Sequence, residues 1–128
     1  KDGFSEKATS KEDSLLKEVL DGHDVGMARM GKMSKYLKQI QAELDSMVKL
    51  PSKSTNKEYQ QNLIDLQEDL NYAQFGMNEW MDKFVLDTLK DKPELRIKYL
   101  ENEKTIVSKV KENILSGLAR ADSLFQKK

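Results

Sequence analysis

The apolar residues of this chain recur at helical spacing over most of its length. In the first third they follow steps of three and four, or their sums, which gathers side chains on one helix face. This stripe consists of Leu16, Leu20, His23, Met27, Met30, Leu37, Leu44 and Val48, and it is widened by Met33, Ile40 and Met47. The pattern predicts one long helix over about 13–50, which Pro51 ends because proline cannot continue a helix.

Two further stripes follow the proline. The second consists of Tyr59, Leu63, Leu66, Leu70, Ala73, Met77, Trp80 and Phe84. It predicts a helix over about 55–89, with Thr55 or Ser54 as the N-terminal cap. The third consists of Leu100, Val107, Val110, Ile114, Ala121 and Leu124. It predicts a helix over about 92–126, with Asp91 as its cap and Pro93 in its first turn.

Three long helices with two short connections predict an all-α fold, an antiparallel up-down-up three-helix bundle over 13–128. A free coiled coil is the alternative, but the proline-containing joints favour folding back within the chain. Residues 1–12 show no sustained apolar period, so we expect a flexible N-terminal tether there. Gly22, Gly26 and Gly31 weaken the first helix, and we expect them to let helices approach closely.

The antiparallel register brings residues from all three helices to one level, because antiparallel helices share the same rise per residue. It places His23 near Phe84, Met27 near Trp80, Met30 near Met77, Glu103 near Trp80, and Tyr99 near Phe84. We call the resulting set the His/Met/Trp layer; its members are His23, Met27, Met30, Met77, Trp80, Met81, Tyr99 and Glu103.

Charge and composition narrow the function classes. The 128 residues carry 22 Lys and Arg against 22 Asp and Glu, with no basic stripe, so we expect no nucleic-acid binding. Cysteine is absent from the sequence, which excludes disulfides, thiolate metal ligands and nucleophilic thiols.

Catalysis has little support in the sequence, and we expect no enzyme. His23 and Asp24 are neighbours on a helix, where successive side chains point roughly 100° apart, so we expect no relay between a base and its orienting carboxylate. No serine lies in a nucleophile-elbow context, and no glycine-rich phosphate loop occurs.

The His/Met/Trp layer has two interpretations. In the first it is core, where methionines fill an irregular space and Glu103 accepts hydrogen bonds from Trp80 and His23. In the second, His23, Met27 and Met30, with Met77 or Met81, bind copper as Cu(I), which thioether and imidazole ligands suit. Trp80 would then cover the ion with its ring face. Haem and zinc fit less well, since one helix would supply both haem ligands and zinc favours more histidine or cysteine.

Three strings resemble a family of small Bacteroidota lipoproteins that are often labelled "viral A-type inclusion protein". They are His-Asp-x-x-Met-x-x-Met at 23–30, Met-x-x-Trp-Met at 77–81, and Tyr-Leu-x-x-Glu-Lys with Val-Ser-Lys-Val-Lys at 99–111. The chain departs from the family pattern at Val25-Gly26 and at Gly117, and both departures leave the layer intact. The resemblance covers nearly all of the helical region.

The resemblance implies a helical domain held at the cell envelope by an N-terminal lipid that precedes this chain; it implies no established activity. We therefore expect a non-catalytic, envelope-anchored binding or structural module, monomeric, with an envelope protein as its partner. Apolar residues outside the stripes, Val85, Leu86, Ile97 and Phe125, either widen the core stripe, which amphipathic geometry favours, or contribute to that contact. A soft-metal binding protein is the alternative.

Overall fold

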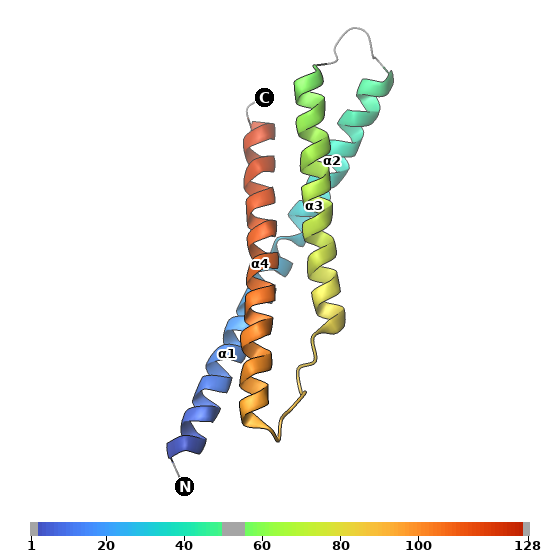
Figure 1. The fold of residues 1–128 in the computed structure, drawn as a ribbon. Helices are drawn as coiled ribbons and strands as arrows, with labels where there is room; N and C mark the ends of the chain where they lie inside the picture. Colours follow the sequence, from blue (N-terminus) through green and yellow to red (C-terminus); the bar gives the residue numbers. More distant parts are fainter. Residues whose placement is uncertain (1–2, 50–55, 127–128) are drawn as a thin grey trace.

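The computed structural model describes residues 3–49 and 56–126, and these residues form an all-helical fold. The helices are α1 (Gly3–Ala28), α2 (Met30–Lys49), α3 (Lys57–Lys83) and α4 (Pro93–Gln126). In Figure 1 the chain ascends through α1 and α2, descends through α3 and ascends again through α4. The predicted all-α class is confirmed.

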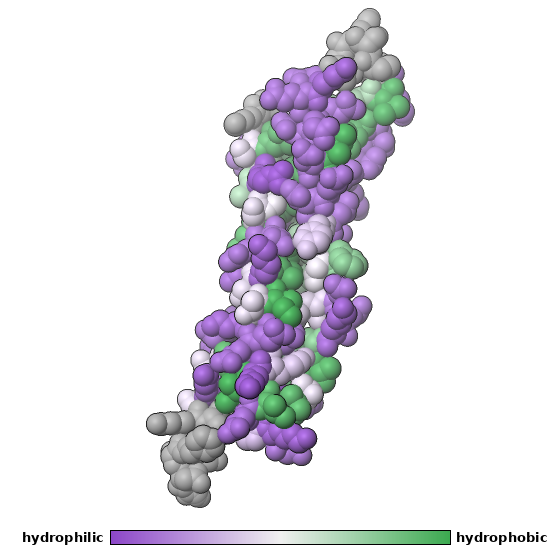
Figure 2. Space-filling view, in the orientation of Figure 1, coloured by the Kyte–Doolittle hydropathy of each residue, from purple (hydrophilic) through white to green (hydrophobic). Residues whose placement is uncertain are grey.

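The longest helix, α4, packs against both α1 and α3, while α2 packs mainly against α3. The second and third apolar stripes are confirmed as core: Leu63, Leu66, Leu70, Ala73, Met77, Leu100, Val107, Ile114 and Ala121 are all buried. Hydrophilic side chains cover most of the face in Figure 2, with apolar patches between them. Among the described helices, none has a segment apolar enough to span a bilayer.

The first predicted helix is interrupted at Arg29, which separates α1 from α2. In a regular helix the Arg29 amide would donate to the Val25 carbonyl; here it donates to Gly26, 3.0 Å away. The Arg29 guanidinium donates to the Val25 carbonyl instead, at 3.2 Å. This local tightening is favoured by the weak helix propensity of the nearby glycines, so the prediction of one continuous helix over 13–50 was wrong.

The same helix begins at Gly3, ten residues before the predicted start, so the prediction of a flexible tether over 1–12 is corrected for the described residues. The end of that segment packs on α4: Glu12 accepts a hydrogen bond of 2.8 Å from the Arg96 side chain, and Lys11 pairs with Glu101 at 3.4 Å. The contacts of Lys11 and Glu12 with α4 are polar, so the spacing of apolar residues did not predict that the helix begins before residue 13.

The buried face of the first helix is also rotated from the predicted one. In α1 the side chains that point into the core are those of Leu15 and Val19, whereas Leu20 and Met27 of the predicted stripe are exposed. In α2, Met33 and Ile40 of the widened stripe are buried as predicted, and Val48 is exposed. Gly22 and Gly26 lie on the buried face as well. The sequence pattern misplaced the stripe because glycines count as breaks in an apolar pattern, although here their small size lets α1 approach its neighbours.

Capping explains the bounds of the other two helices. The N-cap of α3 is Asn56, whose side chain accepts from the Tyr59 amide, so it lies just after the predicted Ser54 or Thr55, which are outside the described residues. Helix α3 ends at Lys83 rather than near residue 89, and Leu89 adopts a positive φ of 61° in the connection. Pro93 begins α4 as predicted.

Arg96 holds the connection between α3 and α4. Its side chain is only 2% exposed, and it donates hydrogen bonds of 2.9 and 2.8 Å to the carbonyl oxygens of Leu86 and Thr88. Its third partner is the carboxylate of Glu12, at 2.8 Å. A buried guanidinium is stable only when paired, so Arg96 joins α1, the connection and α4.

We expect Glu12→Gln to lower the free energy of unfolding by about 2 kcal/mol, because it leaves a buried charge without its counter-ion. Lys11→Gln, in the adjacent position, removes only a half-exposed ion pair and should cost less than about 1 kcal/mol. Urea denaturation followed by circular dichroism measures both. Equal, negligible effects would show that this end of α1 contributes no stability.

At the opposite end of the molecule, Asp122 joins α4 to α2. Its carboxylate accepts hydrogen bonds from the Tyr36 hydroxyl and, at 3.2 Å, from Lys32. The Tyr36 bond chiefly, and then Lys32, hold the pKa of Asp122 below its ordinary value of 3.8. The same hydrogen bond raises the pKa of Tyr36 above 10.0.

The lowered pKa fixes the sign of an acid effect. The unfolded carboxyl group takes up its proton at a higher pH than the folded one, so the contribution of Asp122 is complete above the ordinary pKa of 3.8 and is lost as the pH falls through the lower folded value. Asp122→Asn should therefore reduce the Tm at neutral pH, and the difference from wild type should shrink in acid. Tyr36→Phe should behave alike, and a difference that persists at low pH would contradict this assignment.

Candidate functional site around Trp80

Trp80 is the centre of the His/Met/Trp layer. Its buried indole donates from Nε1 to Glu103 Oε1 at 2.7 Å, which links α3 to α4. Phe84 stacks on the indole with ring centroids 4.7 Å apart, and Tyr99 stacks on Phe84 at 5.9 Å. The predicted pairings of Glu103 with Trp80 and of Tyr99 with Phe84 are confirmed.

His23 lies on α1 beside this aromatic stack, with its ring centroid 5.8 Å from that of Trp80. Its Nδ1 is 3.0 Å from Asp24 Oδ1, and its Nε2 is 3.2 Å from Met81 Sδ. The contact with Asp24 corrects the expectation that these neighbours cannot pair: their Cα–Cβ bonds diverge, but the short aspartate side chain reaches the ring. The expected hydrogen bond to Glu103 is replaced by these two contacts.

The methionines of the layer occupy different environments. Met81 contacts His23, and Met77 is fully buried above Gly26. Met30 packs against the core, whereas Met27 is 39% exposed. Within the described residues the polar contacts of His23 are with Asp24 and Met81, and neither Met27 nor Met30 takes part in them.

The two soft-metal donors that the structure brings into contact in this layer are the His23 imidazole and the Met81 thioether. The described residues contain no group of three or more His, Cys, Asp or Glu side chains that could hold a metal ion. A small hollow of about 220 Å³ adjoins His23 and Met81, and Leu20, Trp80, Phe84 and Leu86 complete its lining. Its side chains come from α1, α3 and the connection that follows α3.

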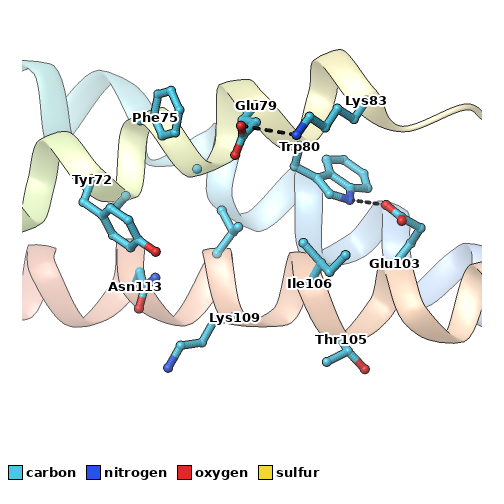
Figure 3. Close-up of a pocket in the computed structure, with 13 residues that line it drawn as sticks. Tyr72, Phe75, Glu79, Trp80, Lys83, Glu103, Thr105, Ile106, Lys109 and Asn113 are labelled. Atoms are coloured by element: carbon cyan, nitrogen blue, oxygen red, sulfur yellow. Dashed lines mark hydrogen bonds and ion pairs between the residues drawn. The ribbon is translucent and has the colours of Figure 1, made fainter.

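A second hollow, of about 500 Å³, is a groove lined only by α3 and α4 (Figure 3). We call it the α3/α4 groove. Its lining consists of Tyr72, Ala73, Phe75, Gly76, Glu79, Trp80 and Lys83 from α3, and of Glu103, Thr105, Ile106, Lys109, Val110 and Asn113 from α4. Trp80 therefore lines two separate hollows, this groove and the small hollow beside His23.

The groove exposes large apolar side chains. Tyr72 is 67% exposed, Phe75 is 59% exposed and Ile106 is 41% exposed. These three side chains were not predicted, because the apolar residues chosen outside the stripes were Val85, Leu86, Ile97 and Phe125. Of those four, Val85 and Leu86 are exposed, and Ile97 and Phe125 are half-buried. The sequence feature that could have indicated the groove is the pair of aromatic residues Tyr72 and Phe75, which lie outside the apolar stripe of α3.

Comparison with known proteins gives no relative from which a function could be transferred. No protein-family model, curated protein or solved structure matches the chain. Any assignment of function therefore rests on the geometry of the Trp80 region.

Close approach of α1 to the layer depends on glycine. A Cβ at Gly26 would overlap the terminal methyl of Met77 and lie 3.1 Å from Ile114, and one at Gly22 would lie 3.2 Å from Val107. The expectation of close approach is thus confirmed for Gly22 and Gly26. It was wrong for Gly31, where a Cβ would meet nothing within 4 Å.

We expect Gly26→Ala to destabilise the protein by up to about 1 kcal/mol, because the added methyl group must displace the flexible end of Met77 and crowds Ile114, which outweighs the gain in helix propensity. Gly31→Ala should stabilise it by up to about 1 kcal/mol, because alanine has the higher helix propensity and the position is open. Chemical denaturation of the two variants gives the comparison. Stabilisation by both substitutions would show that α1 does not pack closely at Gly26.

Proposed function

We propose that this chain is a non-catalytic binding module, an antiparallel up-down-up three-helix bundle whose first arm is α1 followed by α2, and that it captures an amphipathic helix of a partner protein in the α3/α4 groove. The observation that carries the proposal is the row of exposed apolar side chains, Tyr72, Phe75 and Ile106, along a groove that two long helices border. Exposed apolar surface of this kind is typical of a protein-binding face.

The shape of the groove suits a helix. Ala73 and Gly76 lie in its lining, and a Cβ at Gly76 would find only ordinary contact with Val110, 3.6 Å away. Small side chains leave room for the ridge of an incoming helix, while Phe75 and Ile106 provide apolar walls on α3 and α4. A bound helix would pack as the fourth member of a bundle, a common arrangement for helices of this length.

The charges at the groove specify the partner further. Glu79 is already paired with Lys83 at 3.3 Å, and Glu103 accepts from Trp80, as Figure 3 shows. Among the described residues no ion pair engages Lys109 or the Glu103 carboxylate, so the groove offers one positive and one negative charge to a ligand, and Lys109 is the one that an acidic partner residue would pair with. We infer a partner helix with an apolar stripe and an acidic residue beside it.

We further propose that the module works at the cell envelope, held there by an N-terminal lipid. The resemblance of its three strings to the Bacteroidota lipoproteins supports this location. An anchored module needs only modest affinity, because partners confined to one membrane surface meet at a high effective concentration.

The test uses a synthetic helix of about three heptads, with leucine at its a and d positions, glutamate beside them and no tryptophan. The chain contains one tryptophan, and it lines the groove, so Trp80 emission reports binding directly. We expect a Kd in the micromolar range, about −8 kcal/mol. The double variant Phe75→Ser, Ile106→Ser should weaken binding at least tenfold, or about 1.4 kcal/mol.

The matched control is Leu95→Ser, which removes an exposed apolar side chain outside the groove and should leave the affinity unchanged. Equal binding by the double variant and by this control would contradict the proposal. So would a wild-type dimer in sedimentation that the double variant abolishes, because a second copy of the chain would then be the occupant of the groove.

A further inference from the structure

A second site of different chemistry lies next to Trp80, where His23 Nε2 faces Met81 Sδ at 3.2 Å. A neutral imidazole carries one ring proton, and it has two candidate acceptors here. The carboxylate of Asp24, 3.0 Å from Nδ1, is much the stronger acceptor, so we infer the tautomer whose Nδ1 proton is donated to Asp24. The Nε2 lone pair is then directed at a sulfur atom that has no proton to donate.

We propose that His23 Nε2 and Met81 Sδ bind a soft monovalent cation, Cu(I), beside the indole of Trp80. Two lone pairs that face each other at this distance are unfavourable alone, and a cation between them turns the contact into two bonds. Imidazole and thioether are donors that suit Cu(I). With bond lengths like those of zinc, about 2.0 Å to nitrogen and 2.3 Å to sulfur, donors 3.2 Å apart subtend roughly 95° at the ion, so a third ligand from the solution would complete a three-coordinate site.

The surroundings of the pair match the needs of such an ion. Asp24 fixes the tautomer and orientation of the ring, as carboxylates do for histidine ligands of metals. The side chain of His23 is 27% exposed at a small hollow, so an ion can reach it. The Trp80 ring centroid is 5.8 Å from that of His23, and the indole is held in place by the hydrogen bond from its Nε1 to Glu103.

This pair keeps His23 and Met81 of the predicted copper ligands and leaves out Met27 and Met30. Met27 and Met30 follow His23 at helical spacing on the same chain segment, but Met81 comes from α3 and pairs with His23 across the helix interface. The difference makes the proposal testable with conservative variants, since methionine to leucine preserves volume and removes only the sulfur donor. The inference does not rest on the proposed function of the α3/α4 groove.

The experiment is an anaerobic titration of the whole chain with Cu(I), followed by Trp80 fluorescence, with Ag(I) as an air-stable probe in a parallel series. We expect quenching that ends at one ion per chain. Met81→Leu should abolish this stoichiometric phase, whereas Met27→Leu should retain it. Asp24→Asn, which alters only the positioning of the ring, should weaken binding roughly ten- to a hundredfold.

Side-chain nitrogen NMR of His23, the only histidine of the chain, provides a readout besides fluorescence. Without metal, Nδ1 should be protonated and Nε2 bare; the ion should shift Nε2 alone. Absence of stoichiometric binding by wild type, or both nitrogens protonated at neutral pH with no response to Ag(I), would overturn the proposal. Loss of binding in Met27→Leu but not in Met81→Leu would overturn this ligand set. Circular dichroism confirms that each variant remains folded.

Discussion

A buried indole must find an acceptor for its N–H group, and in this protein that requirement fixes the relation between α3 and α4. Trp80 meets it through Glu103, half-buried on the facing helix. This hydrogen bond adds little net stability but determines the register of α4 on α3. A shift of α4 by one turn would leave both groups unpaired in a low-dielectric interface. The stack of Trp80, Phe84 and Tyr99 then follows from the same register.

The remaining packing is organised around this fixed point. Arg96 precedes Glu103 in α4, and it links the start of that helix to Glu12 of α1 and to the connection between α3 and α4. On the other side, Gly22 and Gly26 bring α1 close enough for His23 to reach both Trp80 and Met81. Polar groups with few alternative partners thus set the register, while apolar burial supplies most of the stability.

Sequence pattern predicted the class of fold, the core of α3 and α4, and the pairing of Trp80 with Glu103, because these follow from helical spacing and the rise per residue. It misplaced the core face of α1, where Gly22 and Gly26 do the packing and carry no apolar signal. It also missed what depends on side-chain reach: the Arg96 network, the contact of His23 with Asp24, and the choice of Met81 over Met27. Spacing along one helix cannot determine which side chain of another helix completes a pair.

Trp80 lines both candidate sites, the groove on α3 and α4 and the hollow beside His23. Coupling between two ligands requires an element that each of them shifts between two states. The indole is a poor element of that kind, since Glu103 holds its nitrogen and Phe84 covers one face. A helix in the groove and an ion at His23 should therefore bind independently, although both change the emission of the same tryptophan. Additive binding would mean that Trp80 serves as a common wall between two sites rather than as a switch.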